Sequence, residues 1–337
     1  MALFTKDLGI DLGTLSTRIA AGNLIVLEEP TVVAIAIYEQ KIVEIGRAAQ
    51  EMFGRVPDTI EVSRPLQNGV IADYEVTEKL LEYMIKKVSG PMRFFRPRVM
   101  ITVPYGVTSV ESRAVHEAVL HAGAREAFLL QQPLAAALGI DLPIGTPSGN
   151  MLVSIGGGTT QAAVLAMHGI VCAAFMRAGG MFLDEAISSY VRKKFGLIIG
   201  QSTAEQVKLR IGAAVPQEEE SIIEIQGQDQ ISGLPRPLSL TTDDVVEALQ
   251  EPLGSIVETT RRVLEKTPPE LVSDIIDRGV ALCGGGALLR GIDKFMTKEL
   301  GVPAYLVDNP LTCTAEGAAL ALDPGIYAKI KRNIPVT

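Results

Sequence analysis

The chain has 337 residues, a formal net charge of −8 and a hydrophobic fraction of 47%. At about 150 residues per domain, this length predicts about two domains. With 21% charged residues beside that hydrophobic fraction, the composition excludes a disordered chain. The acidic excess argues against a general nucleic-acid binder, because contacts to phosphates require a surplus of Lys and Arg.

The three cysteines, Cys172, Cys283 and Cys313, lie far apart and form no CxxC pair. They therefore predict neither a disulfide framework nor a zinc site. The most apolar stretch, 162–176, is shorter than the roughly 20 residues that a membrane span requires. We therefore expect a cytoplasmic protein without a membrane-spanning helix.

Short apolar strands alternate with helices along the first half of the chain. Strands are expected at 6–11, 18–21, 31–37, 98–103 and 128–130. Apolar residues at helical spacing predict a helix over 74–88. Thr108 and Glu111 form a capping-box pattern that begins a helix ending near Ala122, and Pro133 suits the first turn of a helix over 134–140. This order of elements predicts an α/β fold.

A Pro- and Gly-rich segment, 142–149, is the expected boundary between two halves. Beyond it we expect strands at 151–155, 161–166, 170–176 and 280–283, and helices at 184–194, 202–211 and 241–264. Ser202 and Glu205 form a second capping-box pattern, and Pro252 is expected to bend or interrupt the last of these helices. The segment 215–240 is expected to contain a hairpin.

A similar glycine turn occurs near the start of each half. Asp11-Leu-Gly-Thr14 and Ile155-Gly-Gly-Gly-Thr159 each join two apolar strands. Such turns usually only reverse the chain, but two at matching positions suggest duplicated halves with a ligand between them. Glycine lets backbone N–H groups approach a phosphate closely. Asp11 would hold a magnesium ion through water beside bound phosphates.

From Lys6 to about Ala321, the chain resembles the MreB family of bacterial actins. The two turns resemble the phosphate loops of that family, Gly284-Gly-Gly-Ala-Leu-Leu-Arg290 resembles its adenosine loop, and 64–73, 267–271 and 308–312 resemble further MreB segments. The resemblance implies an actin-like fold of two related domains, each with a small subdomain. ATP or ADP would lie with Mg²⁺ in the cleft between the domains.

The resemblance also implies domain limits and nucleotide contacts. Domain I would cover 1–144, with a small subdomain at about 33–65, and be completed by 310–337; domain II would cover 145–309, with a small subdomain at about 181–240. The expected nucleotide contacts are Gly13, Thr14, Leu15, Gly156, Gly157, Gly158, Thr159, Gly179, Gly180, Glu205, Lys208, Gly284, Gly285, Gly286 and Ala287. Without such a role, Glu205 and Lys208 would form a solvated i,i+3 ion pair.

The chain departs from the MreB pattern at the expected reaction centre. Ser154 replaces an Asp before the second phosphate loop, and Gln131 and Gln132 replace two Glu residues. The candidate catalytic residues are therefore Asp11, Gln131 and Gln132. A glutamine orients water in some GTPases, but it does not accept a proton as a carboxylate base does. Either a working ATPase tolerates both changes, or, as we favour, the chain binds ATP and hydrolyses it slowly or not at all.

The resemblance implies a filament under the membrane that helps set rod cell shape. Expected partners are copies of the chain itself, the inner face of the cytoplasmic membrane and cell-wall elongation proteins. Phe94 and Phe95 lie among basic residues and are predicted to insert into the membrane; alternatively, they cover the core under the following strand. A sugar kinase or a heat-shock ATPase shares this fold, but the former is usually longer, and the latter needs a substrate-binding domain beyond Thr337. A non-hydrolysing paralogue that copolymerises with an active MreB is the remaining alternative.

Overall fold

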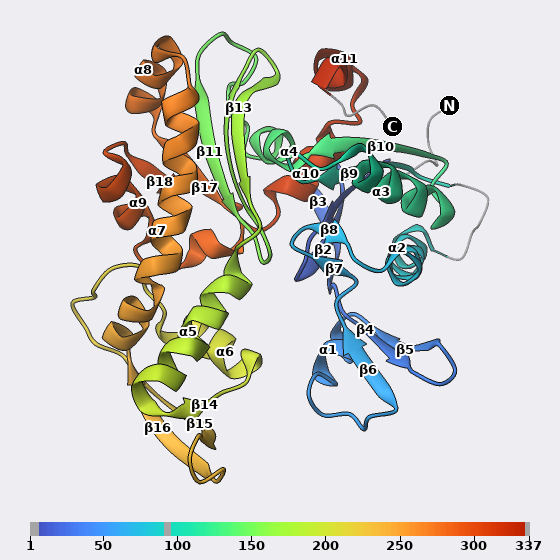
Figure 1. Cartoon of the computed structure of the whole chain (residues 1–337). Helices are drawn as coiled ribbons and strands as arrows, with labels where there is room; N and C mark the ends of the chain where they lie inside the picture. The colour runs from blue at the N-terminus through green and yellow to red at the C-terminus, as the bar shows by residue number, and fades with distance from the viewer. Residues whose placement is uncertain (1–6, 91–95, 334–337) are drawn as a thin grey trace.

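The computed structural model describes residues 7–90 and 96–333, which form two halves that lie side by side (Figure 1). The first half is built on a five-stranded sheet of order β10-β9-β1-β2-β3. Its strands are β1 (Asp7–Leu12), β2 (Ser16–Ala21), β3 (Leu24–Pro30), β9 (Arg98–Val103) and β10 (Glu126–Gln131). Apart from β3, which lies at the edge, these strands are rich in buried aliphatic residues, as a sheet covered on both faces requires.

The second half repeats this plan with a sheet of order β13-β12-β11-β17-β18. Its strands are β11 (Asn150–Ile155), β12 (Thr160–Ala166), β13 (Gly169–Met176), β17 (Val280–Cys283) and β18 (Ala304–Leu306). In both sheets the first three strands along the chain pair antiparallel, and the later two add in parallel. The predicted α/β fold of two related halves is therefore confirmed.

Helices cover both sheets and fill the space between them. The helices of the first half are α2 (Tyr74–Ser89) and α3 (Ser109–His121), and those of the second half are α5 (Gly180–Phe195), α7 (Thr242–Lys266), α8 (Pro269–Arg278) and α9 (Ile292–Leu300). Between the sheets lie α4 (Gln132–Gly139) and α10 (Cys313–Leu320), with α11 (Pro324–Ile330) after them. A Cβ at Gly317 would lie 1.8 Å from Ala135 O, so only glycine lets these two central helices cross this closely.

A small sheet extends from each half at the same end of the molecule (Figure 1). In the first half it consists of β4 (Val33–Ala36), β5 (Lys41–Ile45) and β6 (Ile60–Ser63), with α1 (Arg47–Glu51) beside it. In the second half it consists of β14 (Leu197–Ile198), β15 (Ile222–Asp229) and β16 (Pro235–Thr241), next to α6 (Gln201–Ile211). A short hairpin of β7 (Leu66–Gln67) and β8 (Val70–Ile71) links the first small sheet to its domain.

Most of the predicted elements occur in the structure, with exceptions at helix starts, at the strand 31–37 and at Pro252. The capping box of Thr108 and Glu111 is confirmed, as is the hairpin within 215–240, which β15 and β16 form. The capping box at Ser202 is wrong, because α6 begins at Gln201 after Gly200 without a side-chain cap. The predicted strand 31–37 shortens to β4, and β3 before it was not predicted. The long helix α7 continues through Pro252, because its buried face holds it on both sides.

Candidate functional site

The first glycine turn connects β1 to β2 as a tight reversal. A Cβ at Gly13 would lie 2.6 Å from the carbonyl oxygen of Ser16, so this position requires glycine. Thr31, which follows β3, holds the turn from behind. Its hydroxyl donates to Gly13 O over 2.7 Å, and its N–H donates to Leu15 O over 3.0 Å. Because Thr31 is fully buried, the turn has a fixed support.

The second glycine turn connects β11 to β12 and supports the start of α5. The N–H of Gly156 donates to Thr159 O over 2.7 Å, which closes the turn, and Gly180 N–H donates back to Gly156 O over 2.8 Å. Gly179 packs so tightly that a Cβ there would lie 2.4 Å from Gly156 O. The helix start predicted at Asp184 is therefore wrong by about one turn, since α5 begins at Gly180 with its first N–H bonded to the glycine turn.

The two turns face each other directly. A Cβ at Gly157 would lie 2.4 Å from Leu15 Cγ, and a Cβ at Gly158 would lie 2.6 Å from the hydroxyl of Thr14. That hydroxyl accepts a hydrogen bond from Gly69 N–H over 2.9 Å, so the β7–β8 hairpin also reaches this point. Gly157 and Leu15, which are 142 positions apart in the sequence, and Gly158 and Thr14, which are 144 apart, thus form one glycine-lined junction between the halves.

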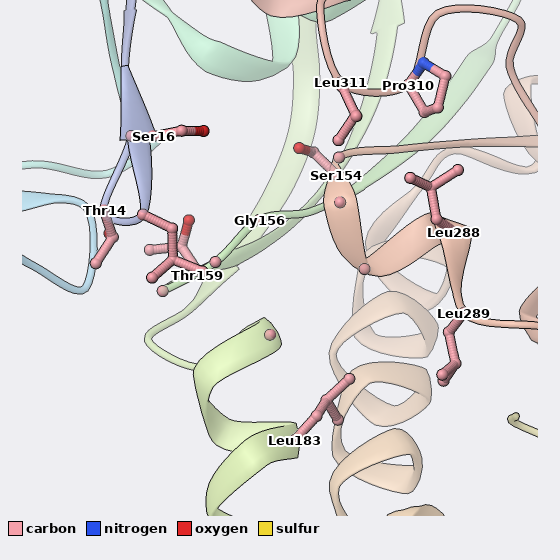
Figure 2. Close-up of a pocket in the computed structure, with 18 of the residues that line it drawn as sticks. Thr14, Ser16, Ser154, Gly156, Thr159, Leu183, Leu288, Leu289, Pro310 and Leu311 are labelled. Atoms are coloured by element: carbon pink, nitrogen blue, oxygen red, sulfur yellow. The ribbon is translucent and has the colours of Figure 1, made fainter. Parts of the chain in front are cut away.

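A cavity of about 500 Å³ lies between the two halves at this junction. Its lining contains both glycine turns, the start of α5, residues of α6 and the segment after β17. Figure 2 shows the two turns on one side and the segment after β17 on the other. Among the predicted contacts, the cavity is lined by Asp11, Gly13, Thr14, Leu15, Gln132, Gly156, Gly157, Gly158, Thr159, Gly180, Glu205, Lys208, Gly284, Gly285 and Gly286. Three predicted residues are absent from this lining: Gln131, Gly179 and Ala287.

The opposite wall is formed by the 3₁₀ helix η1 (Gly285–Leu288). Gly284 has a φ of +82°, and a Cβ there would lie 2.4 Å from Ile155 O. Both the backbone conformation and the close contact therefore require glycine at this position. A Cβ at Gly286 would lie 2.2 Å from Ile155 Cγ2. Ala287 is buried beneath this wall. Apolar residues also line the cavity: Leu183, Leu209, Leu288, Leu289, Pro310 and Leu311. Figure 2 shows Leu288, Leu289, Pro310 and Leu311 on the η1 side.

Lys208 does not form the ion pair with Glu205 that was considered from the sequence. Its Nζ lies 2.7 Å from Asp184 Oδ1 and donates to Gly180 O over 2.9 Å. Burial raises the pKa of the Asp184 carboxyl to about 6, and the Lys208 ammonium limits that rise. Lys208 therefore links α6 to the start of α5. Glu205 lines the cavity. Burial lowers the pKa of the Arg64 guanidinium, and the Glu205 carboxylate limits that fall.

Asp11 is the carboxylate at the junction of the two turns. Its Oδ1 accepts from the Thr102 hydroxyl over 2.9 Å and from Gln132 Nε2 over 3.2 Å. Burial raises the pKa of the Asp11 carboxyl, while the Thr102 bond, the Arg18 guanidinium and the Gln132 bond all lower it. Ser154 lines the cavity at the end of β11. The polar end of the cavity therefore contains one carboxylate, with a serine and a glutamine beside it.

Gln131 and Gln132 lie at the junction between β10 and α4, and only the second faces the cavity. Gln131 ends the strand, whereas Gln132 begins the helix and reaches Asp11. Arg18, which sequence reasoning missed, also lines the cavity. It pairs with Asp11 in the β1–β2 register, so the hairpin around Gly13 was the available signal. The apolar lining was missed because its residues meet only through tertiary packing.

Two further features concern metals and membranes. Within 7–90 and 96–333, no three His, Cys, Asp or Glu side chains form a group that could hold a metal ion. In the same part of the chain, none of the helices combines the length and the apolar character needed to cross a bilayer. Phe94 and Phe95, the predicted membrane residues, lie outside the described residues.

The chain matches the family model described as MreB/Mbl protein over residues 5–327. It is 49% identical to the cell shape-determining protein MreB of Pasteurella multocida over 330 residues, which cover 95% of this chain and 94% of that protein. It is 44% identical to the cell shape-determining protein Mbl of Bacillus cereus over 322 residues, covering 95% of this chain and 97% of Mbl.

Among solved structures, MreB5 of Spiroplasma citri bound to ADP has a TM-score of 0.91 and 31% identity, covering 97% of this chain and 98% of that chain. The structure of the same protein bound to AMPPNP gives the same values. A MamK double helical filament has a TM-score of 0.78 and 21% identity over 93% of this chain and 97% of that chain. At that identity, MamK bears only on the fold, which is actin-like in all three.

Proposed function

The chain belongs to the MreB/Mbl family, and on that premise we propose that it is an ATP-binding cytoskeletal protein. In this proposal the protein polymerises into membrane-associated filaments, helps set rod cell shape, and hydrolyses ATP slowly or not at all. The observation that carries the proposal is the junction of the two glycine turns on one cavity. One turn comes from each half, so a ligand bound there holds the halves together.

The cavity is polar at one end and apolar at the other, as a nucleotide requires. At the polar end, glycines keep the backbone of both turns free of side chains, and successive N–H groups form a site for anions such as phosphates. At the other end, η1 and the leucines beside it offer an apolar surface suited to a base. Support comes from the related MreB5, which was crystallised with ADP and with AMPPNP.

The residues at the polar end fit a magnesium ion that accompanies a nucleotide. Mg²⁺ in such sites keeps several waters and uses one or two carboxylates together with the phosphates of the substrate. Asp11 supplies one carboxylate, with the serine at 154 on the neighbouring sheet. When bound, the ion would neutralise charge on the phosphates. The absence of a three-residue metal group in the described chain is consistent with this, because the phosphates provide the other ligands.

Slow hydrolysis follows from the side chains around Asp11. Ser154 and Gln132 both line the cavity. Both side chains are neutral, whereas the MreB pattern has carboxylates at these positions that would assist ATP hydrolysis. General-base assistance is typically worth about 10²–10⁴ in rate. With Gln132 bonded to Asp11, the chain's own residues bind and orient a nucleotide more readily than they remove a proton from water.

The same two residues favour a second candidate: a non-hydrolysing structural paralogue that copolymerises with an active MreB and modulates it. Sedimentation and phosphate release in ATP, ADP and AMPPNP separate the candidates. A filament-forming ATPase assembles best in ATP and releases phosphate, even if slowly. A structural paralogue polymerises in all three nucleotides without releasing phosphate. Failure to sediment under any condition, alone or with a family MreB, contradicts both.

The membrane and cell-wall parts of the proposal rest on the family alone. In this part of the proposal, the cell-shape role of the related MreB and Mbl proteins is extended to this chain. The protein would lie at the inner membrane through Phe94 and Phe95 and contact cell-wall elongation proteins. The aromatic and basic residues in the sequence 92–98 give the membrane part its physical reason, because such a composition favours an anionic interface.

A further inference from the structure

A chain of hydrogen bonds leads from the backbone of the first half, through β12 of the second half, to Asp11. The N–H of Tyr105 donates to Gln161 Oε1 over 2.7 Å. Gln161 Nε2 donates to Gln132 Oε1 over 2.5 Å, and Gln132 Nε2 donates to Asp11 Oδ1 over 3.2 Å. The Thr102 hydroxyl donates to the same carboxylate oxygen.

The donor-to-acceptor direction of these hydrogen bonds is fixed at both ends of the series. A backbone N–H can only donate, so the Gln161 atom facing Tyr105 has to be the carbonyl oxygen. The other end of that amide is then NH₂, which requires the carbonyl oxygen of Gln132 to face it. This leaves the NH₂ group of Gln132 toward Asp11, where an ionised carboxylate can only accept. Reversing either amide would place two donors or two acceptors together.

The two glutamines differ in their access to the cavity. Gln161 is 1% exposed and is absent from the cavity lining, whereas Gln132 and Asp11 both line it. The carbonyl oxygen of Gln132 is therefore turned toward the protein interior. Its NH₂ group lies on the Asp11 side, with one hydrogen committed to the carboxylate and the other available to a ligand. Toward a nucleotide, Gln132 is a donor.

This orientation matters because an attacking water has to give up a proton. A group that helps must accept a hydrogen bond from the water, and the acceptor of Gln132 is already engaged by Gln161. Gln161 belongs to the second half, opposite Ser154 in the β11–β12 register, while Tyr105 and Gln132 belong to the first. The orientation of Gln132 thus depends on contact between the two halves.

We propose that Gln161 is a positioning residue for ATP hydrolysis: it fixes the amide of Gln132 as a hydrogen-bond donor toward the nucleotide and thereby keeps hydrolysis slow. The inference rests on the nucleotide-binding function proposed above. It differs from that proposal in assigning the low rate to the orientation of one amide, in addition to the missing carboxylates.

The test is Gln161→Glu, which keeps the side-chain length and an oxygen for the Tyr105 N–H but removes the donor. In this variant either orientation of the Gln132 amide places its carbonyl oxygen against a carboxylate. The contact to residue 161 is the shorter one, 2.5 Å against 3.2 Å to Asp11, so we expect the amide to reverse, with its NH₂ bonded to the new carboxylate and its carbonyl oxygen on the side of Asp11 and the nucleotide. In single-turnover assays at saturating Mg²⁺ and ATP, we expect hydrolysis to rise at least tenfold. Gln250→Glu is the matched control, because it adds the same charge at an exposed position on α7, and its rate stays unchanged. A rate within twofold of the unsubstituted chain in Gln161→Glu overturns the inference.

A double-mutant cycle separates positioning from a merely structural effect. In a Gln132→Met background, where no amide remains to reorient, Gln161→Glu should leave the rate unchanged, because the two residues act as one unit. The same tenfold rise in that background would contradict a role through Gln132. Calorimetry with ATP and Mg²⁺ comes first: if the unsubstituted chain binds no nucleotide, the proposed function fails, whereas binding without a Gln161 effect refutes this inference alone.

NMR on the unsubstituted chain tests the orientation even if a variant does not fold. With glutamine side-chain amides labelled, the NH₂ of Gln132 should show a nuclear Overhauser effect to the methyl group of Thr102, since both donate to one oxygen of Asp11. Contact between that NH₂ and the side chain of Gln161, with none to Thr102, would show the opposite orientation and overturn the proposal.

Discussion

Gly157→Ala tests the junction between the two glycine turns. The added Cβ would lie 2.4 Å from Leu15 Cγ and 3.0 Å from its Cβ. Carbon atoms pack at about 3.5–4.0 Å, so the turns have to separate by about 1 Å. Gly157 does not have a positive φ, so the added methyl group acts through its steric clash with Leu15 rather than through backbone strain.

A separation of this size removes at least one backbone N–H from hydrogen-bonding distance of a phosphate held between the turns. A hydrogen bond to a charged group contributes about 1.5–3 kcal/mol, so the Kd for ATP should rise about 10- to 150-fold. Isothermal titration calorimetry in Mg²⁺ measures this change. Gly254→Ala is the matched control: its methyl group meets nothing within 4 Å, so the Kd stays unchanged while thermal stability rises with helix propensity. An unchanged Kd in Gly157→Ala would refute the phosphate-binding role of the turns.

Three further perturbations test other parts of the account. Ser154→Asp combined with Gln132→Glu should raise single-turnover phosphate release at least tenfold, since it restores carboxylates beside the cavity; no rise would mean that other groups limit the rate. Because the native pKa of Asp184 is raised to about 6, its native carboxyl binds a proton more tightly than the unfolded one. Relative to Asp184→Asn, the unsubstituted chain should therefore lose free energy of unfolding as pH rises from about 4 to about 6. Urea titrations at several pH values measure this, and the same pH dependence of the unfolding free energy in both proteins would refute it. Phe94→Ser with Phe95→Ser should abolish co-sedimentation with anionic liposomes, and a double variant that still pellets with lipid excludes that segment as the anchor.

Local sequence signals predicted much of the fold. The capping box at Thr108, the strand at 98–103 and the two glycine turns depend on residues near one another in the chain, so their patterns could be read directly. The duplicated plan was predicted from the turns alone, and the matching strand orders confirm it. The predictions failed at the starts of α6 and α5, which both lack a capping side chain; at Gly180 the backbone N–H bonds to the second glycine turn instead.

The candidate site was predictable wherever backbone conformation decided it. The glycines of the two turns were identified as site residues because a close approach of the backbone to a phosphate requires glycine, whichever residues lie beside it. The partner of Lys208 was not predictable, because the packing of α6 against α5 brings it to Asp184 instead of Glu205. The choice between Gln131 and Gln132 also needed the structure, since it depends on the residue at which β10 gives way to α4.

The central claim is that main-chain amides of the two halves jointly hold the phosphates of an adenine nucleotide. Titrating the full chain with ATP and with ADP in the presence of Mg²⁺, followed by calorimetry, tests it most directly. The account predicts saturable binding of one nucleotide per chain, weakened by Gly157→Ala and unaffected by Gly254→Ala. Absence of binding for both nucleotides, with the chain folded, would contradict it.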